Sequence, residues 1–265
     1  MDKVIVVKLG GATLGSHDTT IEDIVELHKQ GRTLIIVHGG AKVVTEWLSR
    51  QGISSRIIDG ERVTDQARLE MVTAVLGGLV NKEIVALINN LGGRAVGISG
   101  VDGGLIQGKI KNQEMGYMGT VVKVDSTLLE ALLQSDYIPV VAPVSLNSFN
   151  RPDEAPPILN INGDPVAGEI AAAIGAERLI FLTDVVGICD QSGKLLSHLS
   201  PIEAEALMAS GVASGGMIPK IRACLRAISA NSITRIIDGT QPHTLLREIE
   251  ESTGGTTIQR LSGVD

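Results

Sequence analysis

Two lysines and two glycine-rich turns have the residue types that bind a transferring phosphoryl group. Lys8 ends a run of β-branched residues and precedes Gly10 and Gly11, which allow backbone N–H groups to approach a ligand without a Cβ in the way. A lysine beside such N–H groups offers a phosphate oxygen a positive charge and fixed donors. Lys220 follows Gly215-Gly216 and could neutralise the same phosphoryl group. The alternative interpretation is a solvated lysine at a strand end, and this segment alone favours neither.

Three other polar residues are candidates for the same site, and a fourth, His38, has a structural interpretation. Asp164 stands at a predicted helix start, where it could cap the helix or lie between the two lysines and hold them in place. Arg62 has the fork geometry that binds a carboxylate, and Asn160 could donate to a carboxylate or an amide. We interpret His38 as a strand-end histidine packed under the Gly39-Gly40 turn.

Two common nucleotide-binding motifs are not supported. The sequence contains no GxGxxG, and a partial match to the P-loop at 103–109 is interpreted as chance, because Ile110 replaces the Ser or Thr and the segment is typical of a β-arm. Several small-residue turns that follow strands or precede a helix remain, and together they could surround phosphate or carboxylate oxygens. These turns are Gly10-Gly11, Gly39-Gly40, Ser99-Gly100, Asp184–Gly187 and Gly215-Gly216.

The elements that must position these residues alternate between strand and helix. Apolar runs such as 33–37, 138–141 and 179–182 are typical of strands buried on both faces, and helical patterns separate them, which predicts an α/β fold with a parallel sheet. Residues 103–111 and 119–124 instead predict a β-hairpin arm. Ligands of open α/β sheets bind at the carboxyl ends of strands, where Lys8 lies.

The composition excludes several classes of protein. A net charge of −7 argues against a general nucleic-acid binder. Two cysteines without CxxC spacing predict neither a zinc site nor a disulfide framework. The N-terminal apolar run is too short for a signal peptide, and we expect no membrane span. We therefore expect a cytoplasmic protein with no membrane or nucleic-acid partner.

The ordered combination of these turns resembles the amino acid kinase family over nearly the whole chain. Each motif alone is weak, but the order is highly specific, and the run 215–220 is most typical of the branch that phosphorylates N-acetyl-L-glutamate. The matching segments are Lys8–Gly11, His38–Gly40, Arg62–Asp65, Asn81–Glu83, Asn160–Asp164 and Gly215–Lys220.

The resemblance implies a reaction and its catalytic residues. The γ-phosphoryl group of ATP would pass to the side-chain carboxylate of N-acetyl-L-glutamate, in arginine biosynthesis. Lys8 and Lys220 would stabilise the transition state, Asp164 would organise the lysines, and Gly11 would donate a backbone N–H to the phosphoryl group. Mg²⁺ would arrive with ATP, with no metal site made by protein side chains.

The resemblance also implies a fold and two substrate sites. The fold would be a three-layer αβα sandwich around a mostly parallel sheet, with an N-terminal lobe (1–176) for the acceptor and dimerisation and a C-terminal lobe (177–265) for ATP. Gly39, Gly40, Ala41, Arg62 and Asn160 would bind the acceptor. The ATP site would comprise Lys8, Gly10, Thr183, Asp184, Val185, Val186, Gly187, Ile188, Val212, Ala213, Ser214 and Lys220.

Two departures from the family pattern affect these expectations. Ala41 replaces the third glycine after His38, so a methyl group faces the acceptor or the backbone. The segment before the first strand lacks the helical extension typical of arginine-inhibited hexamers, so we expect a homodimer without arginine feedback. A nitrogen-signalling protein is a further candidate partner, as in some relatives.

Two alternatives remain open. A kinase acting on carrier-protein-linked 2-aminoadipate or glutamate needs the same lysines, although Arg62–Asp65 favours the acetylglutamate branch. A non-catalytic nucleotide-binding sensor is disfavoured, because a sensor needs no lysines and aspartate at the transferring phosphate. A plain structural α/β protein leaves the glycine turns unexplained.

Overall fold

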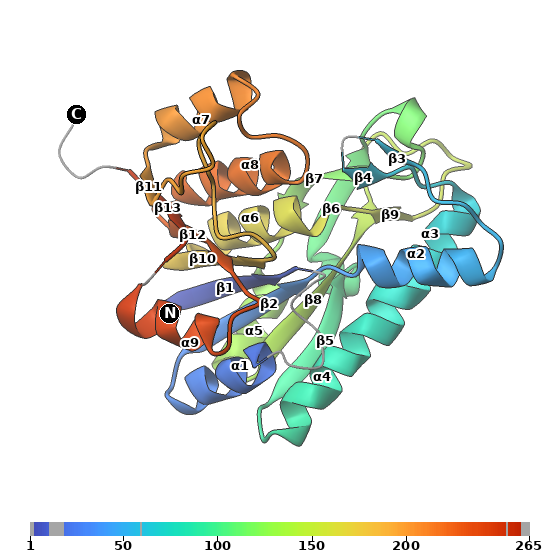
Figure 1. The fold of residues 1–265 in the computed structure, drawn as a ribbon. Coiled ribbons are helices and arrows are strands. Elements are labelled where there is room, and N and C mark those ends of the chain that lie inside the picture. Colours follow the sequence, from blue (N-terminus) through green and yellow to red (C-terminus); the bar gives the residue numbers. More distant parts are fainter. Residues whose placement is uncertain (1–2, 11–18, 59, 253, 261–265) are drawn as a thin grey trace.

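A mostly parallel β-sheet forms the centre of the molecule (Figure 1). The computed structural model describes residues 3–10, 19–58, 60–252 and 254–260. The strands are ordered β11-β13-β12-β10-β1-β2-β8-β6-β7, and β5 and β9 also pair with β8. Their bounds are β1 Val4–Leu9, β2 Thr33–His38, β5 Ala95–Gly100, β6 Ile106–Ile110, β7 Gly119–Val124, β8 Ile138–Asn147, β9 Ile158–Asn160, β10 Arg178–Thr183, β11 His198–Leu199, β12 Ile233–Asp238 and β13 Thr256–Ile258.

Strand β1 lies in the middle of this sheet and explains its own apolar sequence. It pairs in parallel with β2 on one side and with β10 on the other, and all six of its residues are buried. Side chains alternate between the two faces, so Val4 and Val6 enter one core while Ile5, Val7 and Leu9 enter the other. A strand covered on both faces needs apolar residues at nearly every position.

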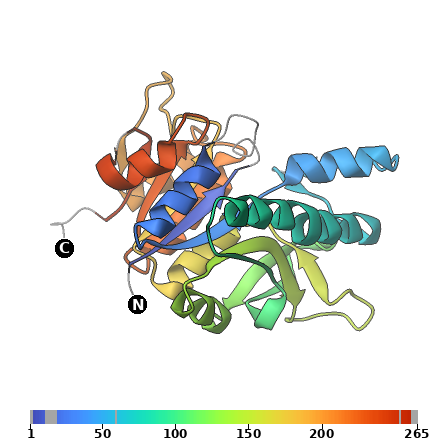
Figure 2. The same cartoon turned by 90° about the horizontal axis from the view of Figure 1, so that it is seen from below.

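Helices cover both faces of the sheet and complete three layers (Figures 1 and 2). The core on one face includes residues of α1 Thr20–Lys29, α2 Ala41–Arg50, α3 Gln66–Val72, α4 Asn81–Asn90 and α9 Thr244–Glu251. The core on the other face includes residues of α5 Thr127–Gln134, α6 Gly163–Ile174, α7 Pro201–Ala209 and α8 Met217–Ile228. The predicted αβα sandwich is therefore confirmed.

The apolar spacing of the sequence predicts one helix that carries Leu69, Val72, Val75 and Leu76 and another over Leu79–Asn90, whereas the structure has one continuous run. Helices α3 and α4 are joined without a break by a π-helical segment, η1 Thr73–Val80. By length and composition alone, the run 66–90 is also apolar enough to cross a membrane, with a mean hydropathy of 1.7. Its buried residues, such as Val75, Val80 and Ile84, pack in the core beside the sheet, as in a core helix of a globular protein.

The proposed boundary between the two lobes does not coincide with a break in the core. Strand β10 follows the boundary in sequence, yet it pairs directly with β1, with Ile5 opposite Arg178. Each hydrophobic core contains residues from both parts of the chain. The division at residue 176 therefore stays a prediction about function.

The predicted hairpin arm is confirmed, because β6 and β7 pair in antiparallel fashion. A second small sheet joins β3 Ile57–Ile58 to β4 Glu61–Arg62.

Candidate active site

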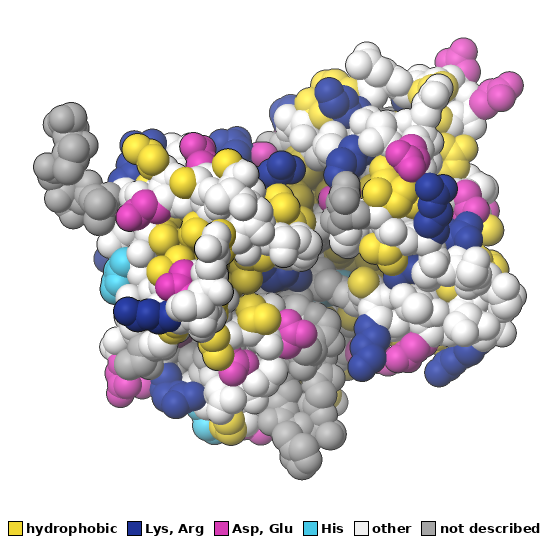
Figure 3. Space-filling view, turned by 45° about the horizontal axis from the view of Figure 1, so that its top comes forward, with side chains coloured by type: hydrophobic (Ala, Val, Ile, Leu, Met, Phe, Trp, Pro, Cys, Tyr) yellow, Lys and Arg dark blue, Asp and Glu magenta, His cyan; other side chains and the backbone are white. Residues whose placement is uncertain are grey.

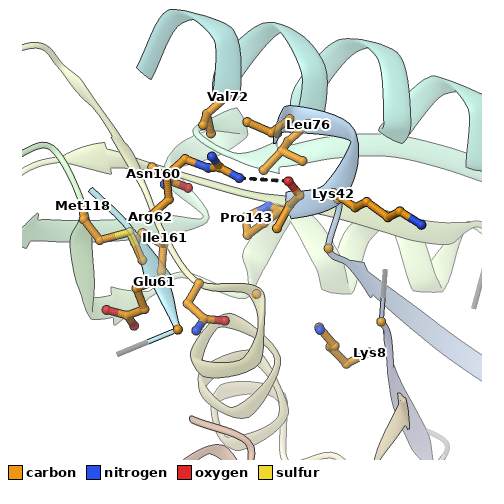
Figure 4. Close-up of a pocket in the computed structure, with 18 of the residues that line it drawn as sticks. Lys8, Lys42, Glu61, Arg62, Val72, Leu76, Met118, Pro143, Asn160 and Ile161 are labelled. Carbon is orange, nitrogen blue, oxygen red and sulfur yellow. Dashed lines mark hydrogen bonds between the residues drawn. The ribbon is translucent and has the colours of Figure 1, made fainter. Parts of the chain in front are cut away.

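A cavity of about 500 Å³ opens beside the carboxyl ends of β1, β2 and β10. Figure 3 shows a hollow on this face, with dark blue side-chain atoms of basic residues at its floor. In Figure 4, Lys8 lies on one side of the cavity, while Arg62, Val72 and Leu76 lie on the other. The cavity therefore has a basic side and a side with apolar residues.

The basic side is built around one buried carboxylate. Asp164 is only 4% exposed, and its two oxygens contact different lysines. The Nζ of Lys8 lies 2.9 Å from Oδ1, and the Nζ of Lys220 lies 3.0 Å from Oδ2. Burial alone would raise the pKa of Asp164, but the charges of the two lysines outweigh it and lower the pKa below its ordinary value. At neutral pH the group is one carboxylate between two ammonium ions.

The helix start at Asp164 decides between the two interpretations of this residue. The cap of α6 is Asn162, whose side chain accepts a hydrogen bond from the Asp164 N–H at 3.0 Å. Asp164 is therefore not the cap, and its side chain is directed to the lysines. A carboxylate in the first helical turn is also stabilised by the helix dipole.

Two of the predicted turns contain a glycine that the structure requires, each for a different reason. The Gly10 N–H donates to Leu182 O at 3.0 Å, and a Cβ at Gly10 would lie 2.8 Å from that oxygen. Gly10 thus permits the close approach of β10 and does not offer this N–H to a ligand. Gly40 has a φ of +143°, and a Cβ there would lie 2.6 Å from Leu76 Cδ2. Gly11 lies outside the described residues.

Arg62 is held by the first turn of α2. Its guanidinium donates to Ala41 O at 2.9 Å, to Thr45 Oγ1 at 2.8 Å and to Ser55 Oγ. These bonds use three of its five N–H donors. Burial and the nearby charge of Arg68 lower the pKa of Arg62. Ser55 and Thr45 are supporting residues that the sequence analysis missed, since neither belongs to a recognisable motif.

Asn160 lies at the end of β9 and also lines the cavity. Its amide donates to Thr64 Oγ1 at 2.9 Å, and that hydroxyl donates to Arg62 O at 2.8 Å. The structure therefore brings together Gly39, Gly40, Ala41, Arg62 and Asn160, which were predicted for the acceptor. Apolar neighbours that sequence reasoning missed line the same part of the cavity. They are Val44, Val72, Leu76, Met118 and Pro143.

The residues predicted for ATP divide into two groups. Lys8, Gly10, Thr183, Asp184 and Lys220 line the cavity. The remaining residues do not line it: Val185 and Val186 are exposed, Gly187, Ile188 and Ala213 are buried, Val212 is partly buried and Ser214 is exposed. Their role in ATP binding stays a prediction.

Known proteins have sequences similar to nearly the whole of this chain. The sequence profile described as "Amino acid kinase family" matches residues 3–238. A protein of Dehalococcoides mccartyi (strain CBDB1) named "Acetylglutamate kinase" is 51% identical, with 96% of this chain and 94% of that protein covered. A protein of Nostoc sp. (strain PCC 7120) with the same name is 46% identical, with 97% and 87% covered.

Solved structures show the same fold at lower identity. N-acetylglutamate synthase from Neisseria gonorrhoeae superposes with a TM-score of 0.83 at 23% identity, over 99% of this chain and 61% of that one. The family profile and the curated relatives cover almost all of this chain. The chain therefore belongs to the amino acid kinase family.

Proposed function

We propose that this chain transfers the γ-phosphoryl group of ATP to the side-chain carboxylate of N-acetyl-L-glutamate. The product would be N-acetyl-L-glutamyl 5-phosphate, an intermediate of arginine biosynthesis. The observation that carries the proposal is the buried carboxylate of Asp164 between Lys8 and Lys220, at one side of a cavity that Arg62 enters from the other. The names of the curated relatives support the choice of acceptor.

The proposed reaction depends on electrostatic stabilisation of the transition state and not on a general base. The acceptor carboxylate is already ionised at neutral pH, so no proton must be removed. One carboxylate oxygen attacks the γ-phosphorus, the bond to the bridging oxygen of ATP breaks, and ADP leaves with that electron pair. Two anions must approach each other, and charge spreads over the transferring group. The ammonium groups of Lys8 and Lys220 would offset both effects.

The substrates would occupy opposite sides of the cavity. The phosphates of Mg-ATP would lie near Lys8, Lys220 and the turn after β10, with Mg²⁺ brought by the nucleotide. Among the described residues, no group of three or more His, Cys, Asp and Glu side chains lies placed to hold a metal ion. Arg62, Asn160 and the first turn of α2 would hold the acceptor, because their donors match its carboxylate and amide groups.

Trapping of the acyl phosphate tests this proposal. The purified protein is incubated with Mg-ATP and hydroxylamine in four separate reactions. Each reaction contains one acid: N-acetylglutamate, glutamate, aspartate or 2-aminoadipate. Hydroxamate from N-acetylglutamate alone is the expected result. No hydroxamate from any free acid, with ATP still bound, would contradict the proposal and favour a carrier-linked acceptor or a sensor.

A homodimer in the cytoplasm is part of the same proposal. Leu87 and Leu91 near the end of α4 are 50% and 46% exposed, and a contact between subunits would bury such side chains. Light scattering after size-exclusion chromatography would report about twice the mass of the chain if the dimer forms, and the mass of one chain if it does not.

A further inference from the structure

A chain of buried polar side chains lies directly behind the Gly39-Gly40 turn. His38 and Asn81 are both 0% exposed, in a core that is otherwise aliphatic. The Asn81 Nδ2 lies 3.2 Å from His38 Nε2, and His38 Nδ1 lies 2.7 Å from Gly39 O. At the outer end, Lys82 Nζ donates to Asn81 Oδ1 at 3.0 Å. The chain therefore runs from a lysine at the surface to a backbone carbonyl at the cavity.

Each atom of this chain can have only one role. Gly39 O can only accept, so His38 Nδ1 must carry the ring proton and Nε2 must accept. The Asn81 amide must turn its NH₂ toward Nε2, because that group also donates to the backbone oxygens of Val140 at 2.9 Å and Ile98 at 3.3 Å. Its oxygen then faces Lys82, which also donates to Gly97 O at 3.0 Å. The donors all point in the same direction, toward Gly39.

The last hydrogen bond fixes the orientation of one peptide group. The described backbone contains no cis peptide bond, so the C=O of Gly39 and the N–H of Gly40 point in opposite directions. Since Gly39 O is directed at the buried His38 ring, the Gly40 N–H points away from the ring, toward the cavity that both glycines line. Among the described residues, the N–H groups of Gly40 and Ala41 donate no backbone hydrogen bond.

We propose that His38, Asn81 and Lys82 are positioning residues that hold the Gly39-Gly40 turn so that the N–H groups of Gly40 and Ala41 bind the acceptor, since the N–H of Gly39 already donates to Leu9 O at 3.0 Å. This inference rests on the proposed function. The turn is a demanding one because Gly40, between the end of β2 and the start of α2, adopts a φ of +143°, which residues with a side chain rarely adopt. Burial lowers the pKa of His38 to about 4 against the effect of its bond to Gly39, so the ring stays neutral and keeps this single pattern of donors. Asn81 and Lys82 of the Asn81–Glu83 segment, which resembles the family pattern, would thus act by positioning this turn.

Substitution of Asn81 tests the inference, with a matched control on the same helix. Asn81→Leu removes the amide that orients His38. Asn89→Leu removes another α4 amide, which bonds to the backbone of Ala95 and not to the turn. We expect Asn81→Leu to raise the KM for N-acetylglutamate by about tenfold or more, because displaced binding groups weaken binding steeply. The KM for ATP should stay within about twofold in both variants, as should the acceptor KM of Asn89→Leu.

Substitutions of His38 and Lys82 keep the test decisive if Asn81→Leu folds poorly. His38→Asn places an amide near the position of Nδ1 and should retain more acceptor affinity than His38→Leu. Lys82→Met acts at the exposed end and should raise the acceptor KM less than Asn81→Leu. An unchanged acceptor KM in all of these variants, or equal changes in Asn81→Leu and Asn89→Leu, would overturn the inference.

A readout without catalysis separates this inference from the proposed function. In the ¹⁵N-labelled wild-type protein, the His38 ring should show a protonated Nδ1 and an unprotonated Nε2 at pH 7. The opposite tautomer would overturn the inference even if hydroxamate forms from N-acetylglutamate. Conversely, failure of wild-type protein to form hydroxamate from any acid would overturn the proposed function, whatever the tautomer.

Discussion

The two sides of the cavity are organised by different forces. On the basic side, charged groups contact each other directly, with Asp164 between Lys8 and Lys220. On the acceptor side, neutral hydrogen bonds and glycine geometry set the shape of the turn at 39–41, and Arg62 is tied to it. From this difference we expect a division of labour between the two sides: the basic side would determine the rate of phosphoryl transfer, and the acceptor side would determine the affinity for N-acetyl-L-glutamate.

The largest effect is expected from removing a lysine. Lys220→Ala or Lys8→Ala should lower kcat by about a hundredfold or more, because preorganised charge at the transferring group is lost. Steady-state kinetics with both substrates varied would measure this, and circular dichroism would check the fold. Near-normal turnover in either variant would remove the basic side from the mechanism.

Asp164 should have the next largest effect, on both rate and stability. Asp164→Asn leaves two ammonium groups beside a neutral amide, so we expect a fall in kcat of about tenfold or more. The wild-type carboxyl has a pKa below its ordinary 3.8, so the folded chain binds this proton less readily than the unfolded chain does. Its contribution to stability is therefore present at neutral pH and is lost as the pH falls through the lowered pKa.

Urea unfolding of both proteins at several pH values measures this contribution. Between about pH 5 and pH 2, the free energy of unfolding should fall less steeply for Asp164→Asn than for the wild type, since the variant lacks this group. Parallel curves for the two proteins would mean that Asp164 does not titrate as the ion pairs require.

Arg62 tests the acceptor side of the comparison. Arg62→Ala should raise the KM for N-acetylglutamate by about tenfold or more with a smaller change in kcat. The reason is that the variant lacks the charged guanidinium that would bind a carboxylate of the acceptor. Arg68→Ala is a suitable control, since the guanidinium of Arg68 bonds to the carboxylate of Asp65 and to Ser54 O and does not line the cavity. A pure loss of kcat in Arg62→Ala would contradict the division of labour.

The smallest effect is expected at Ala41. It begins α2, and Ala41→Gly restores the third glycine of the family pattern. The N–H stays available, so the acceptor KM should change by less than about threefold, while unfolding should become easier by up to about 1 kcal/mol. Thermal unfolding and acceptor kinetics measure the two effects. A larger shift in KM would show that the methyl group touches the acceptor.

The residues that line the cavity were more predictable than the contacts that hold them in place. Lys8 and Lys220 follow strand and turn patterns that sequence periodicity identifies, and the αβα layers follow from buried apolar strands such as 4–9. The support of the acceptor turn depends on contacts between distant residues. Asn81 lies 43 positions from His38 in sequence, and no local pattern shows that their side chains meet.

Helix boundaries show the same limit. The two helices expected from the apolar spacing are separated at Gly77-Gly78, yet the run continues through these glycines as a π-helical segment packed beside the sheet. Tertiary packing outweighs the low helix propensity of glycine at these positions. Likewise, the choice between a capping and a bridging role for Asp164 required the position of Lys220, which is 56 residues away.

The rate of phosphoryl transfer in a single turnover tests the central claim most directly. Rapid quenching of Lys220→Ala and wild-type protein, with enzyme in excess over Mg-ATP and with saturating N-acetylglutamate, isolates the chemical step from product release. The account predicts that this rate falls by about a hundredfold or more in Lys220→Ala. A rate within about threefold of the wild type would contradict it, because catalysis would then not depend on the paired lysines.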